Sequence, residues 1–186
     1  NAVHAFQANW QRGCMRKIIA LIILASLRLA AETAPAEKKS IEYEGETYFL
    51  AHADATADQA LEEYLREGET LENWTKMVSV RAFRSFDDPK EIVRLFVAAL
   101  KKQHPDAPYE AARIPETREI MLEFVTWPPD GSYAEINVWK FRKVSAGVVA
   151  FQFALRKPDT RAVLADFKKT RPQMLKVMAG AQFAVD

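Results

Sequence analysis

The stretch that decides the fold is residues 68–83, GETLENWTKMVSVRAF, in which a polar turn leads through one tryptophan into a strand. Gly68 is a typical turn residue. After Trp74 the chain alternates with a period of two, so that one face carries Val78, Val80 and Ala82 and the other Ser79, Arg81 and Phe83. Because β-branched residues in such alternation favour a strand, we expect the rest of the chain to pack around this one.

The turn itself allows two interpretations, because Glu69, Glu72, Asn73 and Thr75 all lie close in sequence to the indole of Trp74. In the first, these polar groups form a small binding pocket beside an aromatic wall, where the two carboxylates could work as acid and base. In the second, Asn73 and Thr75 bond the local backbone and Trp74 fills the core. We favour the structural interpretation, since no metal-ligand or triad spacing accompanies the turn.

Residues 15–36 predict an export signal. A basic start, Met15-Arg16-Lys17, precedes the apolar run Ile18–Leu27, and Ala34-Pro35-Ala36 supplies small residues for cleavage. The apolar run is about half the ~20 residues that a membrane-spanning helix needs, so we expect no stable membrane span after removal of the signal. A bacterial protein of this kind would be periplasmic or secreted.

The basic start also divides the chain. Signal peptides begin with their basic region, and here that region comes after residues 1–14. We therefore interpret residues 1–14 as an upstream extension that is not native. The remainder, residues 37–186, is long enough for a single α+β domain.

Composition excludes several classes of function. The six glycines are isolated from one another, which leaves no phosphate-binding loop, and no GxSxG elbow occurs. The single cysteine, Cys14, precedes the apolar run, and the three histidines are scattered at His4, His52 and His104. We therefore predict no metal site, no cofactor and no catalytic residue set.

The net charge indicates that the partner is not a nucleic acid. Residues 1–36 hold four of the 26 basic and one of the 25 acidic residues, so the remainder carries a net charge of −2. A mildly acidic body lacks the basic surface that nucleic-acid binding requires. The expected partner is an unknown protein or small ligand in the periplasm.

Local signals place the remaining elements. Asp87 or Asp88 caps a helix over 88–104, with Pro89 in its first turn and Pro105 at its end, and a helical region spans 159–180. Residues 58–65 fit either a helix turn or a strand. The strand segments are a hairpin of 41–43 and 46–51, the Trp74 strand, a weak segment at 109–114, and a meander of 119–127, 133–141 and 144–155. We predict an α+β fold with a mainly antiparallel sheet of about five to seven strands and both helical regions packed on one face.

The leader, the GETLENWT motif at 68–75, the meander and the C-terminal helix together resemble a family of small exported proteobacterial proteins of unknown function. The order of elements is also similar to that of PsbP/Mog1-type α+β proteins. The resemblance brings no catalytic set and implies a binding or assembly role.

The candidate binding residues are aromatic and polar. Tyr133 and Trp139 share a strand face, and they join the turn residues Glu69, Glu72, Asn73 and Trp74. The face of Trp139 is either a contact surface or a surface buried beneath the helices. We expect a non-enzymatic binding or assembly module. The alternative is a hydrolase-type enzyme that uses the Glu69/Glu72/Asn73 turn.

Export with cleavage is testable directly. The basic start and the small residues at 34–36 predict that protein recovered from the periplasm begins between Glu32 and Lys38. N-terminal sequencing of that fraction measures the cleavage site. A full-length chain recovered from the cytosol would contradict the prediction.

Overall fold

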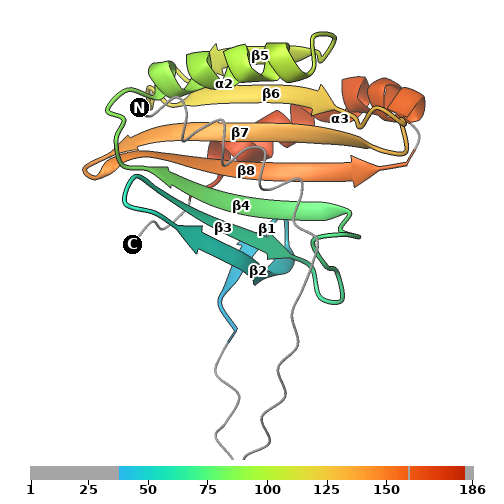
Figure 1. Cartoon of the computed structure of the whole chain (residues 1–186), viewed down its shortest axis with the longest axis horizontal. Coiled ribbons are helices and arrows are strands. Elements are labelled where there is room, and N and C mark those ends of the chain that lie inside the picture. The colour runs from blue at the N-terminus through green and yellow to red at the C-terminus, as the bar shows by residue number, and fades with distance from the viewer. Residues whose placement is uncertain (1–37, 159, 183–186) are drawn as a thin grey trace, which may run out of the picture. The chain divides into compact units, whose positions relative to one another are not determined.

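The computed structural model describes residues 38–158 and 160–182, although not the side chains at 160–162 and 164–166. The predictions for residues 1–14 and 15–36 lie outside the described residues. Within them, eight strands form one open antiparallel sheet in the order β1-β2-β3-β4-β8-β7-β6-β5 (Figure 1). The strands are β1 (Ser40–Tyr43), β2 (Glu46–Ala55), β3 (Gln59–Leu65), β4 (Lys76–Phe83), β5 (Tyr109–Arg113), β6 (Ile120–Thr126), β7 (Ala134–Val144) and β8 (Gly147–Lys157).

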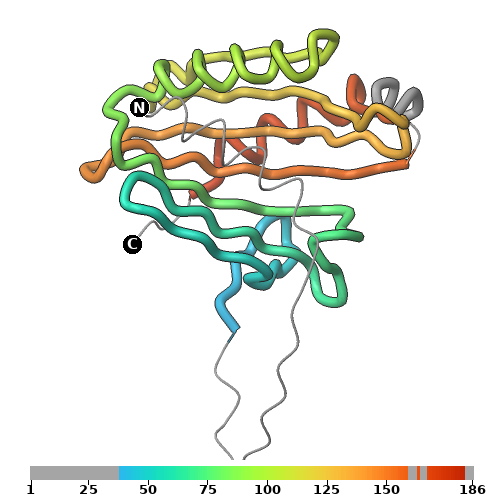
Figure 2. Tube along the Cα trace, viewed as in Figure 1, coloured from blue at the N-terminus to red at the C-terminus, as the bar shows by residue number. Residues whose placement is uncertain are grey.

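Three predicted units are confirmed. β1 and β2 form the hairpin, and its turn residues Glu44 and Gly45 have φ values of 54° and 75°, as a tight two-residue turn between antiparallel strands requires. β4 follows Trp74, and β6, β7 and β8 form the meander, whose course the backbone trace in Figure 2 shows. The fold is thus α+β with an antiparallel sheet, as expected.

The strand count is higher than the five to seven expected, because both uncertain segments are strands. Residues 59–65 pair with β2 on one side and with β4 on the other. A helix would have placed Tyr64 and Leu65 on one stripe, whereas the strand sends them to opposite faces, where they are 1% and 2% exposed. Burial of side chains on both faces of the sheet therefore favours the strand more than the local i, i+3, i+4 spacing favours a helix.

The prediction that both helical regions pack on one face is wrong. Phe96 of α2 (Pro89–Gln103) contacts Trp139 of β7 with a ring separation of 5.0 Å. Met174 and Met178 of α3 (Thr160–Gly180) belong instead to the cluster of the neighbouring residue Val138. Because consecutive residues of a strand point to opposite faces, the two helices cover opposite faces of the sheet (Figure 1).

The predicted helix start and stop of α2 are confirmed. The side chain of Asp88 accepts a hydrogen bond of 2.9 Å from the Lys90 N–H, and the His104 N–H donates to the Leu100 carbonyl at 2.7 Å. The buried face of α2 rests on β6 and β7. No helix in the described part of the chain is long and apolar enough to cross a membrane.

Two cations hold α3 against the other face. Lys140 of β7 donates to the carbonyls of Ala179, at 3.4 Å, and Ala181, near the C-terminal end of the helix, where positive charge is favourable. Burial lowers the pKa of this lysine. Arg171 forms ion pairs with Glu110 of β5 and Glu123 of β6. These contacts fix α3 along the meander.

Phe96 tests the packing of α2. Its ring is 2% exposed and lies between Phe124 and Trp139. Phe96→Ala should lower the free energy of unfolding by roughly 3–5 kcal/mol, because it leaves a cavity in the core. Lys102→Ala, at an exposed position of the same helix, should change it by less than about 0.5 kcal/mol. Equal unfolding midpoints in denaturant for the two variants would contradict this packing.

Candidate functional site

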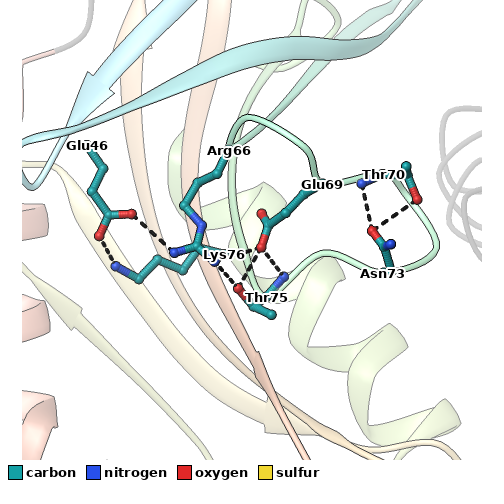
Figure 3. Close-up of polar contacts among 7 residues, drawn as sticks. All are labelled: Glu46, Arg66, Glu69, Thr70, Asn73, Thr75 and Lys76. Atoms are coloured by element: carbon teal, nitrogen blue, oxygen red, sulfur yellow. Dashed lines mark hydrogen bonds and ion pairs between the residues drawn. The ribbon is translucent and has the colours of Figure 1, made fainter.

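The turn between β3 and β4 is closed by its own side chains. Gly68 has a φ of +81°, which a side chain would strain. The Oδ1 atom of Asn73 accepts hydrogen bonds from the Thr70 N–H at 2.8 Å and the Thr70 hydroxyl at 3.1 Å (Figure 3). That hydroxyl also lies 2.7 Å from Oε2 of Glu72. Asn73 and Glu72 are therefore engaged within the turn.

Glu69 fastens the two ends of this turn together. Its Oε1 atom accepts hydrogen bonds from the Thr75 N–H at 2.9 Å, the Thr75 hydroxyl at 2.6 Å and Nη2 of Arg66 at 2.8 Å (Figure 3). Burial opposes ionisation of this carboxyl, but the hydrogen bonds from Arg66 and Thr75 outweigh it and hold the pKa of Glu69 below its usual value. Glu69 is thus a largely buried anion with a structural role.

The same network reaches the neighbouring strands. Nη1 of Arg66 lies 3.5 Å from Oε2 of Glu46, and Lys76 forms an ion pair with the other oxygen of that carboxylate. The hydrogen bond from Lys76 lowers the pKa of Glu46. Because Glu46 starts β2 and Lys76 starts β4, the turn is tied to strands on both sides of β3.

Trp74 packs beneath this turn against an arginine. Its side chain is 5% exposed and joins a small cluster with Leu65, Met77 and Ala154. The guanidinium of Arg156 lies 4.0 Å from the centre of the Trp74 ring and 4.4 Å from that of Tyr133. A cation that lies over two rings is stabilised by both ring faces.

The polar edge of Arg156 is also occupied. Its Nε and Nη2 atoms donate to Oε1 of Glu135 at 3.1 and 2.9 Å, and Nη1 donates to the Glu72 carbonyl at 3.3 Å. The planar guanidinium thus stacks on two rings while it bonds the carboxylate of one strand and the backbone of the turn. Arg156 connects the turn to the β7–β8 hairpin.

The structure brings most of the predicted site residues together, but they surround Arg156 and do not form a pocket. Trp74, Tyr133 and the backbone of Glu72 surround Arg156, and Glu69 and Asn73 close the turn beside it. Trp139 lies apart: it is 3% exposed, stacks on Phe141 and contacts α2. Its face is therefore the buried one of the two alternatives.

Sequence reasoning missed Arg156. A signal was present, because the tight β7–β8 turn pairs Val144 with Gly147, and this register places Arg156 opposite Glu135. Opposite charges directly across an antiparallel pair form a favourable contact. The same reasoning would have placed Arg156 beside Tyr133, two residues before Glu135.

A second candidate lies at the far edge of the sheet, where a groove of about 340 Å³ separates α2 from β5. Its apolar lining includes Val93, Val97 and Ile120, and its cationic side chains are Lys90, Arg94 and Arg113. All five residues of β5 are exposed. Sequence reasoning missed this groove, because it interpreted 109–114 only as a weak strand. The alternation of basic and apolar residues at 90, 93, 94 and 97 was the available signal.

No group of three or more His, Cys, Asp or Glu side chains in the described ranges is arranged to hold a metal ion. Comparison with protein-family models gives a match over residues 36–183, which spans the turn, the sheet and both helices. Comparison with curated proteins gives no match.

The pKa of Glu69 yields a prediction about acid stability. Because that pKa is below the unfolded value of about 4.3, the ionised carboxylate stabilises the fold above this pH, and the contribution is lost as the pH falls through the folded value. At pH 7, Glu69→Gln should lower the free energy of unfolding by roughly 1–3 kcal/mol. The gap from wild type should begin to narrow below about pH 4 and shrink further as the pH falls through the folded pKa of Glu69.

Denaturant unfolding between pH 7 and pH 3 measures the gap. Glu67→Gln removes a charge from an exposed side chain of the same turn and should leave stability nearly unchanged. A gap for Glu69→Gln that stays constant over the whole range would show that the charge of Glu69 does not hold the turn.

Proposed function

The chain belongs to the protein family whose model covers residues 36–183, a family of uncharacterised function, and we propose that it is an exported, non-enzymatic module that binds another protein. Export is supported by the leader predicted at residues 15–36. The resemblance to PsbP/Mog1-type proteins supports a binding role by analogy of fold. In this proposal the groove between α2 and β5 makes the contact, and the turn at 68–75 has a structural role.

The observation that carries this proposal is the exposed edge of the sheet. β5 is the last strand, it is exposed throughout, and a groove with an apolar lining runs beside it. Proteins commonly recognise peptides by lengthening a sheet at such an edge, with neighbouring pockets for side chains. The groove is shallow and open, and its lining is mainly apolar, as suits contact with another protein.

The hydrolase alternative finds no support in the turn. The pKa of Glu69 is lowered by its hydrogen bonds, and the hydrogen bond from Thr70 lowers that of Glu72. Acid–base hydrolysis needs two carboxyl groups whose environments push their pKa values apart, so that one remains protonated near neutral pH. Here both are shifted in the same direction, which favours two carboxylates.

Charge reversal in the groove tests the binding role. Arg94 is exposed on α2, and Arg94→Glu should abolish the capture of a specific protein from periplasmic extract, because it removes the net positive charge of the α2 wall of the groove, where Lys90 is the other cation. Lys102→Glu makes the same change on the same helix, away from the groove lining, and should leave capture intact. Mass spectrometry of the bound fractions compares the variants. Identical bound fractions from both variants and wild type would refute the groove as the contact.

A further inference from the structure

Resting on the proposed function, we propose that the occupant of the groove is an extended acidic segment of a partner protein, which adds to β5 as a further strand of the sheet. Such a strand would pair its backbone with the free edge of β5 and direct its carboxylates toward Lys90, Arg94 and Arg113. Three features support this occupant: the backbone of β5, the shape of the groove and its charge.

The backbone of β5 has its free hydrogen-bonding groups in a defined register. The Ile114 N–H donates to the Glu119 carbonyl, and the Val125 N–H donates to the Pro108 carbonyl. In an antiparallel pair the hydrogen-bonded positions alternate with the others, so residues 108, 110, 112 and 114 bond to β6. The N–H and C=O groups of Tyr109, Ala111 and Arg113 therefore point to the open edge, where an incoming strand can pair with them.

The side chains of these three residues point toward the α2 side. Each lies opposite a residue of the α2 face, namely Phe124, Leu122 and Ile120. The 5.1 Å approach of Lys101 from α2 to the ring of Tyr109 agrees with this orientation. Alternate side chains of an added strand would therefore lie beneath α2 and beside the groove.

The charge around the groove selects the partner. Lys90, Arg94 and Arg113 contribute three positive charges, and none of them forms an ion pair with another residue in the described part of the chain. The acidic residue of β5, Glu110, lies on the other face, in an ion pair with Arg171. Carboxylates on an added strand could thus pair with Lys90, Arg94 and Arg113 beside the apolar lining of the groove.

Neither protection of the edge strand nor self-association explains both the apolar groove and the cations around it. Charged side chains alone can protect an edge strand from aggregation, but that role does not require a hollow of about 340 Å³ lined with valine and isoleucine. A second copy that paired β5 with β5 would bring two sets of the same cations together, which like-charge repulsion opposes. An acidic segment from another protein matches both the open backbone edge of β5 and the positive charge of the groove.

The test uses a synthetic probe with matched controls. The probe is the capped peptide Thr-Glu-Val-Glu-Val-Glu-Thr, whose alternation suits a strand. One control replaces each Glu by Lys. The other carries N-methyl groups along the edge that would face β5, which prevents backbone pairing with that strand. Titration calorimetry with the full chain should show binding of the acidic probe only. Arg94→Glu should weaken it by about tenfold or more, and Lys102→Glu should leave it unchanged.

A readout at residue level separates strand addition from simple charge attraction. On addition of the acidic probe, amide exchange should slow at Tyr109, Ala111 and Arg113, whose N–H groups would become bonded. Binding of the N-methylated control as tightly as the probe, or binding without this protection, would overturn the proposal. So would equal binding of the Lys control, a preference for phosphatidylglycerol vesicles over the peptide, or dimerisation through β5 in sedimentation.

The outcomes also distinguish this inference from the proposed function. If Arg94→Glu abolishes capture from extract while the acidic probe does not bind wild type, the module binds through the groove but not by adding an acidic strand. If capture is insensitive to Arg94→Glu and the probe also fails, both proposals are wrong. Binding of the probe with protection at Ala111 supports the strand even before the natural partner is known.

Discussion

One guanidinium lies over two aromatic rings, and the arrangement of the turn and the β7–β8 hairpin depends on it. Arg156 touches the faces of Trp74 and Tyr133, pairs with Glu135 and bonds the backbone of Glu72. These contacts need a flat cation with donors along its edge, a geometry that lysine cannot reproduce. The turn at 68–75 is thereby fixed from one side by Arg156 and from the other by the network of Glu69, Arg66 and Glu46.

This arrangement bears on where function lies. Glu69, Glu72 and Asn73, which sequence reasoning offered as a pocket, each have one oxygen bonded by a neighbour in the turn, although Oε2 of Glu69 is buried without a hydrogen bond. Two helices cover opposite faces of the meander, so the backbone groups that remain open there belong to the edge strand β5. The groove beside β5 supplies the apolar surface and the charge that the turn lacks.

Local signals predicted most of the fold. The alternation in β4, the Glu44-Gly45 turn and the Asp88-Pro89 start each act within a few residues, and each was correct. The faces covered by the helices could not be predicted in this way. β6 has apolar residues on both parities, with Leu122 and Phe124 on one and Met121 and Val125 on the other, and such a strand is buried on both faces. Only the contacts of α2 and α3 show which helix takes which face.

The candidate site was predictable only where its residues are close together in sequence. Trp74, Glu69 and Asn73 are neighbours in sequence, so their cluster was visible there. Arg156 is 82 residues away from Trp74 by number, and its place becomes clear only from the register of β7 against β8. The groove was hidden because it joins a helix to a strand of five residues that alternation alone barely defines.

A double-mutant cycle between Trp74 and Arg156 tests most directly whether this turn is a structural element. We predict that Trp74→Ala and Arg156→Ala each lower the free energy of unfolding, and that their effects couple by about 0.5–2 kcal/mol. A control cycle that pairs Trp74→Ala with Lys143→Ala, at an exposed position near the β7–β8 turn, should be additive within about 0.3–0.5 kcal/mol. Additivity of Trp74→Ala with Arg156→Ala would contradict the structural role and leave the turn available as the functional site.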